Sequence, residues 1–237
     1  LVFEKYRALV TDRLGPAALR GAIFVDPTAE QPYLFHLALT LLVRDADPAF
    51  SDFAQPATVD CRLVGVKQFE GSELAFCPVE HLLLLKGGAG LPAAAQRLAA
   101  TAEAHRQRAF AFVSEELRAR ATARQSALKD TLPEREQFLR RGFDYQEAEL
   151  AATRAALAVK ARDGNKGATL ELARVKEQQS QLAPRRDQAI AALRREPELI
   201  AAALVQFIAH ALVVPSTDPA DKERYDAQVE LVAMNIA

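Results

Sequence analysis

A long stretch from Ala93 to Arg195 most constrains the fold, because it consists mainly of residues that favour the α-helix. Ala, Leu, Glu, Gln, Arg and Lys dominate it, and these residues lose little conformational entropy in a helix. Two segments rich in strand-forming residues flank it. The stretch is too long for one globular helix, so we expect several helices that fold back on one another. The sequence therefore predicts an α+β protein: an antiparallel β-sheet body, an inserted long antiparallel helical arm of coiled-coil type, and a C-terminal helix.

Composition limits the class of protein further. Half of the 237 residues are hydrophobic, which is enough for a substantial core. Cys61 and Cys77 form no disulfide framework and lack metal-ligand spacing, so we expect reduced thiols in a cytoplasmic protein. The most apolar run, residues 199–215, contains Gln206 and His210 and is too short for a membrane span, so we expect no contact with a membrane.

The N-terminal part predicts a short helix and several strands. Residues 1–15 have apolar positions at helical spacing. Residues 18–27, closed by Asp26-Pro27, and 33–45 are strand-like and are expected to face each other across the short loop TAEQP as a hairpin. A third strand is expected over Ala57–Phe69. A fourth weakens after Pro78, where a short helix over residues 79–85 fits as well.

Helix-breaking and turn-forming residues divide the helical arm. We expect one helix from Leu91 to about Leu132, closed by Pro133, and a second helix that breaks at the turn Asp163-Gly164-Asn165. A third helix is expected to break at Pro184. The second helix should bury an apolar set consisting of Phe138, Leu139, Phe143, Leu150 and Leu157. The arm is then a hairpin or three-stranded bundle of helices.

The C-terminal part returns to the sheet. Val205–Val214 is expected to be a strand, residues 199–205 fit either a helix or a strand, and a terminal helix should begin at Pro219. The predicted organisation is a sheet body over residues 1–92, an inserted helical arm over 93–197, and a completing strand and helix over 198–237.

No catalytic chemistry is visible. The four histidines, His36, His81, His105 and His210, are scattered without zinc-ligand spacing, and we expect them in the core or at contacts. The glycine-rich segment 87–90 lacks the Lys-Ser/Thr of a phosphate-binding loop, so we interpret it as a flexible joint. We therefore predict no catalytic residue, no metal site and no cofactor in this chain.

Charge is distributed unevenly along the chain. Residues 96–195 hold 20 Lys/Arg against 13 Asp/Glu, whereas the remainder holds 10 against 18. Such a split fits either a nucleic acid or acidic partner, or attraction between the arm and the body. Arginine and lysine grip phosphates without reading sequence. The residues predicted to contact a nucleic-acid backbone are Arg118, Arg120, Arg124, Arg140, Arg141, Lys160, Arg162, Lys166, Arg185, Arg186, Arg194 and Arg195. Ordinary solubilising side chains remain the alternative.

The segments FLRRGFDYQEAELAATRAAL and ARVKEQQSQLAPRRDQAIAALRREPELI resemble the region after the motor core of bacterial Swi/Snf-type helicase-related proteins, the RapA-like and DISARM-helicase-like group. RGAIFVDP and HALVVPSTDPADKERYDAQVE resemble the same family. The family binds ATP through a Walker loop and a DEAD/DEAH-type box. Neither motif occurs here, so the resemblance transfers no catalytic residue, and ATP and Mg²⁺ would belong to a parent chain.

Two functions follow as expectations. The first is a non-catalytic C-terminal accessory region of an ATP-dependent DNA helicase or translocase, cut from a longer chain because it starts at Leu1, that contacts DNA and its own motor domains. The second is a protein-interaction module whose arm binds RNA polymerase or another defence-complex subunit without nucleic acid. A free-standing enzyme is the weakest expectation, because no spacing of polar residues suggests a catalytic pocket.

Overall fold

The computed structural model describes residues 22–71, 74–88, 93–216 and 218–236. The helix predicted for residues 1–15 lies outside the described part. Contacts divide the chain into two compact units: unit 1 comprises Leu1–Leu42, Asp60–Ala119 and Ala202–Ala237, and unit 2 comprises Val43–Val59 and Arg120–Ala201. The boundaries between the units fall within α4 (Ala102–Asp130) and within three strands, β2 (Tyr33–Arg44), β3 (Ala57–Phe69) and β6 (Ile200–Pro215). The predicted α+β class is confirmed.

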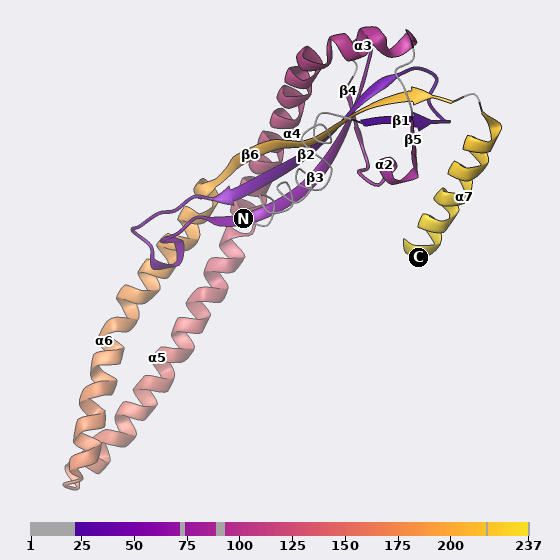
Figure 1. Ribbon diagram of the computed structural model, residues 1–237. Helices are drawn as coiled ribbons and strands as arrows, with labels where there is room; N and C mark the ends of the chain where they lie inside the picture. Colours follow the sequence, from indigo (N-terminus) through magenta and orange to yellow (C-terminus); the bar gives the residue numbers. More distant parts are fainter. Residues whose placement is uncertain (1–21, 72–73, 89–92, 217, 237) are drawn as a thin grey trace, which may run out of the picture. The chain divides into compact units, whose positions relative to one another are not determined.

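The strands form a six-stranded sheet in the order β4-β3-β2-β6-β1-β5 (Figure 1). Their bounds are Ala22–Asp26 for β1, Tyr33–Arg44 for β2, Ala57–Phe69 for β3, Leu74–Cys77 for β4, Lys86–Gly87 for β5 and Ile200–Pro215 for β6. The predicted third strand is confirmed at both ends. Residues 200–204, for which the sequence left helix and strand open, belong to β6.

The pairing of β1 differs from the prediction in two ways. β1 pairs in parallel with β6, with Phe24 opposite Val213, and antiparallel with β5, with Phe24 opposite Gly87. The expected hairpin between β1 and β2 is therefore wrong, because β6 lies between them. The sheet is mixed rather than antiparallel. A short loop permits a hairpin, but it does not require one, and the periodicity of β1 does not reveal which strand becomes its neighbour. Gly87, expected in a flexible joint, is held in β5.

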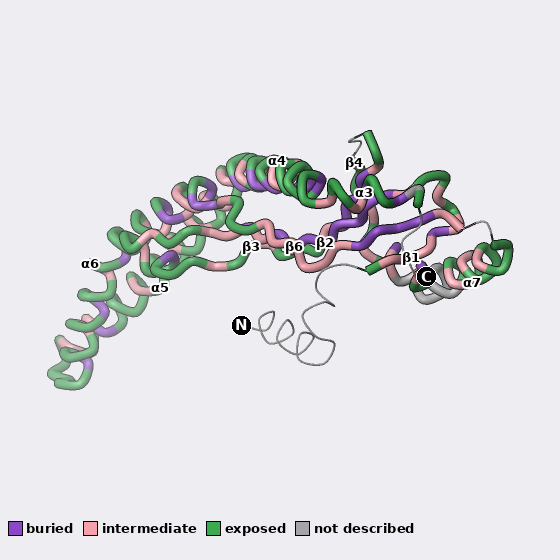
Figure 2. Tube along the Cα trace, turned by 45° about the horizontal axis from the view of Figure 1, so that its top comes forward, coloured by how far each residue is buried: buried purple, intermediate pink, exposed green. Residues whose placement is uncertain are grey.

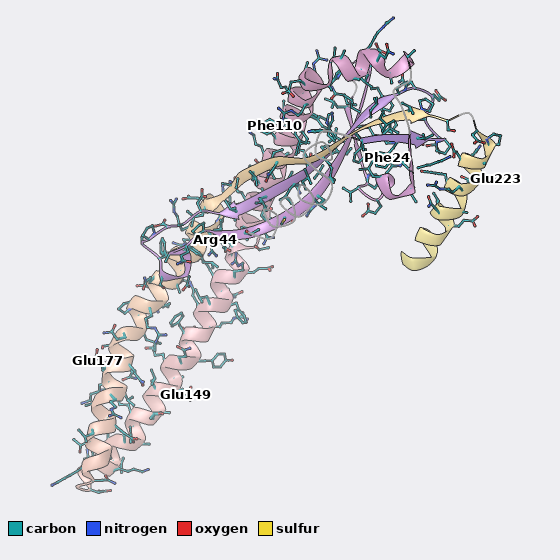
Figure 3. All side chains as sticks on the ribbon, viewed as in Figure 1. Phe24, Arg44, Phe110, Glu149, Glu177 and Glu223 are labelled. Carbon is teal, nitrogen blue, oxygen red and sulfur yellow. The ribbon has the colours of Figure 1, made fainter. Side chains whose placement is uncertain are left out.

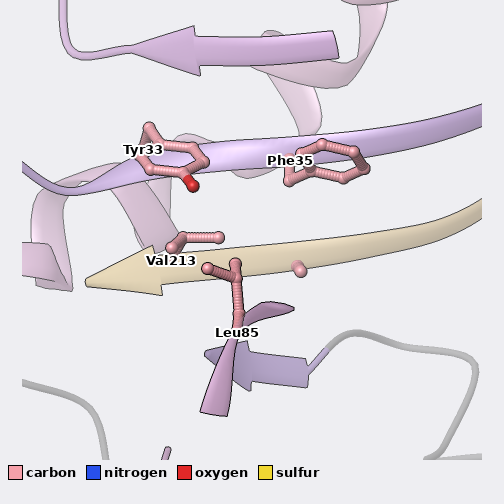
Figure 4. Close-up of a cluster of buried hydrophobic side chains, with 5 residues drawn as sticks. Tyr33, Phe35, Leu85 and Val213 are labelled. Atoms are coloured by element: carbon pink, nitrogen blue, oxygen red, sulfur yellow. The ribbon is translucent and has the colours of Figure 1, made fainter. Parts of the chain in front are cut away.

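Both faces of the sheet in unit 1 are covered. One face buries Tyr33, Phe35, Leu85, Ala211 and Val213 (Figure 4). The other face buries Leu34, Leu212 and Val214 against Ala95 and Leu98. Consecutive residues of β2 and β6 thus alternate between two cores, which explains why both strands are apolar nearly throughout.

The helices are α2 (His81–Leu84), α3 (Gln96–Ala100), α4 (Ala102–Asp130), α5 (Leu132–Arg162), α6 (Lys166–Arg195) and α7 (Pro219–Ile236). Short 3₁₀ segments are η2 (Ser51–Phe53), η3 (Ala93–Ala95) and η4 (Glu196–Leu199). The predicted turn at residues 163–165 is confirmed: Gly164 has φ 84°, and the Asn165 side chain accepts a hydrogen bond from the Ala168 amide.

Two predicted helix boundaries are wrong, and the break predicted near Leu132 lies at Thr131, between α4 and α5. The first predicted helix is divided at Thr101 into α3 and α4. Pro133 lies in the first turn of α5, where the missing amide proton costs little, instead of closing the preceding helix. α6 continues through Pro184, which is exposed. Proline in a helix interior costs about 3 kcal/mol, and the burial of Leu182 and Ile190 on either side of it in sequence offsets that cost.

In unit 2, α5 and α6 lie side by side (Figures 1 and 2). Their common seam buries Leu157, Ala168 and Val175, flanked by the partly buried Leu150 and Leu172. The antiparallel helical hairpin is therefore present. Phe138, however, was expected to be buried on α5 and is 80% exposed.

Candidate functional site

The twelve predicted phosphate-contacting residues divide into two groups in the structure. Arg118 and Arg120 lie on α4, and each takes part in a hydrogen-bonding or electrostatic interaction. Four more are engaged by carboxylates: Arg140, Arg186, Arg194 and Arg195. The other six form no ion pair within the described residues: Arg124, Arg141, Lys160, Arg162, Lys166 and Arg185.

Glu136 of α5 holds two of the paired arginines. Its carboxylate accepts hydrogen bonds from Arg194 of α6 at 2.5 and 2.9 Å, and it lies 3.7 Å from Arg140. These arginines keep the pKa of Glu136 below its usual range. Arg195 donates to Asp47 at 2.9 Å and also contacts Glu198. The contacts join α5, α6 and the loop after β2 within unit 2.

An open hollow of about 490 Å³ in unit 2 is lined by Arg140, Arg194 and Arg195. Three arginines around one hollow make it a candidate phosphate site. Asp187 and Glu198 line the same hollow. Glu136 and Asp47 neutralise its arginines from the side. Carboxylates thus line the hollow and pair with Arg194 and Arg195, which leaves little unpaired positive charge there for an anion.

The unpaired cations gather at the turn between α5 and α6. Lys160 and Arg162 end α5, and Lys166 begins α6; all three are exposed. Asp163 is the acidic residue between them. We call Lys160, Arg162 and Lys166 the basic tip. Their side chains are hydrogen-bond donors without an ion pair among the described residues.

An exposed apolar stripe on α5 was missed in the sequence. Phe138 is 80%, Tyr145 78% and Val159 59% exposed. Residues three, four and seven apart share one side of a helix. The stripe is defined as Phe138, Arg141, Tyr145, Ala148, Ala152, Ala156 and Val159, all exposed. It lies on the side of α5 opposite the seam that includes Leu150 and Leu157, because the two sets are offset by about half a helical turn.

The sequence of α5 contains two sets of apolar residues at helical spacing. One set includes Leu150 and Leu157, and the other, which includes Phe138 and Tyr145, lies on the opposite side of the helix. A helix that packs on one neighbour needs one apolar face. Glu149, labelled in Figure 3, borders the stripe and is exposed. Of the stripe, only Phe138 was predicted to be buried, together with Leu139, Phe143, Leu150 and Leu157, and that placement of Phe138 is wrong.

A buried polar cluster lies elsewhere, in unit 1, around Asp26 at the end of β1. The Tyr33 hydroxyl donates to Asp26 Oδ2 at 2.7 Å, and His81 Nε2 lies 3.1 Å from the same oxygen and 2.8 Å from the Tyr33 hydroxyl. Thr28 donates to Asp26 Oδ1 from its amide at 2.8 Å and its hydroxyl at 2.6 Å. Lys67 Nζ is 3.9 Å from Oδ2.

These contacts satisfy the Asp26 carboxylate rather than activate a group for chemistry. Burial alone would raise the pKa of Asp26, but the hydrogen bonds from His81, Thr28 and Tyr33 together hold the pKa well below its usual range. Burial and the adjacent Asp26 raise the pKa of Tyr33 strongly, so the phenol stays protonated. A carboxylate fixed as an anion and a phenol fixed as a neutral donor lock β1, β2 and α2 together.

Three histidines form a second cluster in unit 1. His36 Nδ1 lies 2.8 Å from His210 Nδ1, and Phe207 packs against both rings. His36 Nε2 and His105 Nδ1 are buried and form no hydrogen bond within the described residues. Gln68 also approaches His36, although neither end of its side-chain amide is hydrogen-bonded. His36 and His105 are buried, as expected for core histidines, whereas His210 is half-buried.

The residues that the structure describes contain no group of three or more His, Cys, Asp or Glu side chains suited to a metal ion. Within that same part of the chain, none of the helices has the length and apolar character needed to cross a membrane. No protein-family model, curated protein or solved structure matches the chain.

The histidine cluster predicts that the protein loses stability in mild acid. Burial, and then the charge of His210, lower the pKa of His36 to about 4. Burial also lowers the pKa of His210 and His105. As the pH falls below 6.5, the unfolded chain binds protons that the folded chain does not, so the free energy of unfolding decreases.

Between pH 6.5 and 5 the loss from His36 alone should be about 2 kcal/mol. Urea denaturation at a series of pH values measures this loss of free energy of unfolding. Between pH 6.5 and 5, carboxylates with ordinary pKa values remain mostly ionised. His36→Gln should flatten the slope. An unchanged slope in this variant would show that His36 does not titrate as its burial implies.

Proposed function

We propose that this protein is a non-catalytic interaction module that binds another protein through the exposed stripe of α5. The observation that carries the proposal is the exposure of Phe138 and Tyr145, about four fifths each, on one side of a well-formed helix. The free thiols Cys61 and Cys77 support our further proposal of a cytoplasmic protein.

The physical reason is the cost of leaving such rings in water. An aromatic side chain offers roughly 150–250 Å² of surface, and its burial is worth about 25 cal/mol per Å². Aromatic residues and arginine are also the side chains that most often dominate the binding energy of protein interfaces. Arg141, which belongs to the stripe and lacks an ion pair among the described residues, fits that pattern.

Gly142 next to the stripe points in the same direction. It lies within α5, where glycine costs about 1 kcal/mol relative to alanine, and a Cβ atom placed there would have open space around it. No internal packing explains the absent side chain. A partner that approaches the helix backbone closely at this position would explain it.

The basic tip favours a second proposal, an accessory region of an ATP-dependent DNA helicase or translocase that touches the DNA backbone. Its support is the unpaired set Lys160, Arg162 and Lys166, together with the resemblance of the sequence to Swi/Snf-type helicase-related proteins. In this second proposal the α5 stripe docks on the motor domains, and ATP and Mg²⁺ bind the motor alone.

Photo-crosslinking tests the first proposal. With p-benzoylphenylalanine in place of Tyr145, irradiation of cells that express the protein should yield a discrete adduct, identified by mass spectrometry. The matched control carries the same group in place of Leu170, which is 69% exposed on α6 and lies outside the stripe. We expect a yield about tenfold higher at position 145, as for an interface hot spot. Equal yields at the two positions would contradict the proposal.

Fluorescence anisotropy with a short DNA duplex tests the second. The triple variant Lys160→Gln, Arg162→Gln, Lys166→Gln should weaken binding and reduce its salt dependence by about three phosphate contacts. The control triple, Arg140→Gln, Arg194→Gln, Arg195→Gln, removes cations that carboxylates already neutralise and should change affinity much less. Larger losses in the control would reverse this assignment, and no binding at low salt would end the DNA proposal.

A further inference from the structure

We propose that the partner of the α5 stripe is the same stripe of a second copy of this chain, with the two α5 helices antiparallel. The proposal rests on the proposed function, because it names the occupant of the same surface.

The stripe is bulky in its N-terminal half and small in its C-terminal half. Phe138, Arg141 and Tyr145 occupy the first half, and Ala148, Ala152 and Ala156 precede Val159 in the second. A flat or uniformly bulky stripe would suit many partners. This asymmetric one requires a partner surface that is small where the stripe is large and large where the stripe is small.

An antiparallel second copy has that shape. When Ala148 of one helix lies opposite Glu149 of the other, Tyr145 lies opposite Ala152 and Phe138 lies opposite Val159. Each aromatic ring then packs on a smaller side chain of the other copy. Because the dimer has two-fold symmetry, each of these contacts occurs twice. A parallel pair would instead place ring against ring at one end and alanine against alanine at the other, which leaves gaps.

Charges at the ends of α5 favour the same direction. Glu134 in the first turn is exposed and has no ion pair within the described residues, and the last turn carries Lys160 and Arg162. In the antiparallel pair, Glu134 of one copy lies near the two cations of the other, although Asp163 weakens the attraction. In a parallel pair the like charges face each other. Antiparallel helix dipoles add to the preference.

The size of the stripe predicts a weak dimer. The two rings contribute roughly 150–250 Å² per side chain, and the alanines, Val159 and the stem of Arg141 add to this. The total buried by both copies reaches only the lower end of the roughly 1,200–2,000 Å² typical of specific interfaces. We therefore expect association in the micromolar range and a concentration-dependent mass.

Sedimentation equilibrium of the complete chain is the test. The weight-average mass should rise from the monomer value of 25.9 kDa toward twice that value as concentration increases through the micromolar range. Tyr145→Glu should weaken dimerisation at least about tenfold, as expected for an aromatic hot spot. Leu170→Glu, at an apolar position on α6 that is 69% exposed and outside the stripe, should leave dimerisation unchanged. Circular dichroism confirms that both variants fold.

Single cysteines test the orientation, in a background with Cys61→Ser and Cys77→Ala. Ala148→Cys lies near the two-fold axis and should form a disulfide-linked dimer. Val159→Cys should not, since its two copies are about 30 Å apart at 1.5 Å per residue in the antiparallel pair. Mixed Phe138→Cys and Val159→Cys proteins should cross-link to each other. Efficient self-linking of Val159→Cys would establish a parallel pair and overturn the proposed orientation.

The outcomes separate this inference from the function on which it rests. A chain that stays monomeric at every concentration, but cross-links from position 145 to a different protein, refutes self-association and leaves the interaction module intact. A chain that stays monomeric and cross-links no better at position 145 than at 170 refutes both. A dimer that Tyr145→Glu does not weaken shows that the copies associate through another surface.

Discussion

Strand β6 is the constraint on which the sheet depends. It pairs in parallel with β1 and is also the neighbour of β2, so it joins the two halves of the sheet. Its consecutive residues Leu212 and Val213 contribute to the cores on opposite faces. Ala22 and Ala211, which are paired, are almost the full chain apart. In sequence, the helices α4 to α6 lie between the first five strands and β6, the strand that completes the sheet. Because β1 and β6 are so distant in sequence, their pairing is expected to make folding slow.

In the helical hairpin of unit 2, the two sides of α5 carry different side chains: one side packs against α6, and the other is exposed. The inner side packs Leu150 and Leu157 against α6 and is supported by the Glu136–Arg194 ion pair. The outer side carries aromatic rings that nothing in the described structure covers. Near the inner side, Glu136 and Asp47 neutralise Arg194 and Arg195. At the turn, Lys160, Arg162 and Lys166 form no ion pair within the described residues. The exposed aromatic rings of the outer side and the cations of the turn are the two surfaces on which the proposed functions rest.

The sequence predicted what local patterns determine. The bounds of β3, the turn at Gly164 and the core positions of His36 and His105 follow from periodicity and turn chemistry. The partner of β1 did not follow, because strand pairing is decided by surfaces distant in sequence. Pro184 was misjudged, since tertiary packing outweighs a single unfavourable residue. Of the candidate site, the charge excess was visible, but its neutralisation by Glu136 and Asp47 depends on which helices meet. Phe138 and Tyr145 were visible as apolar residues, although not as a second face.

The central claim is that the two sides of α5 serve different purposes, one for folding and one for binding. Hydrogen exchange of the α5 and α6 amides at low protein concentration tests it most directly, by comparing Leu157→Ala with Tyr145→Ala. The account predicts that Leu157→Ala lowers the local free energy of opening by about 2–5 kcal/mol, as for a buried leucine, and that Tyr145→Ala changes it by less than about 0.5 kcal/mol. A loss of similar size in both variants would contradict the account, because it would show that the outer face is part of the protein's own core.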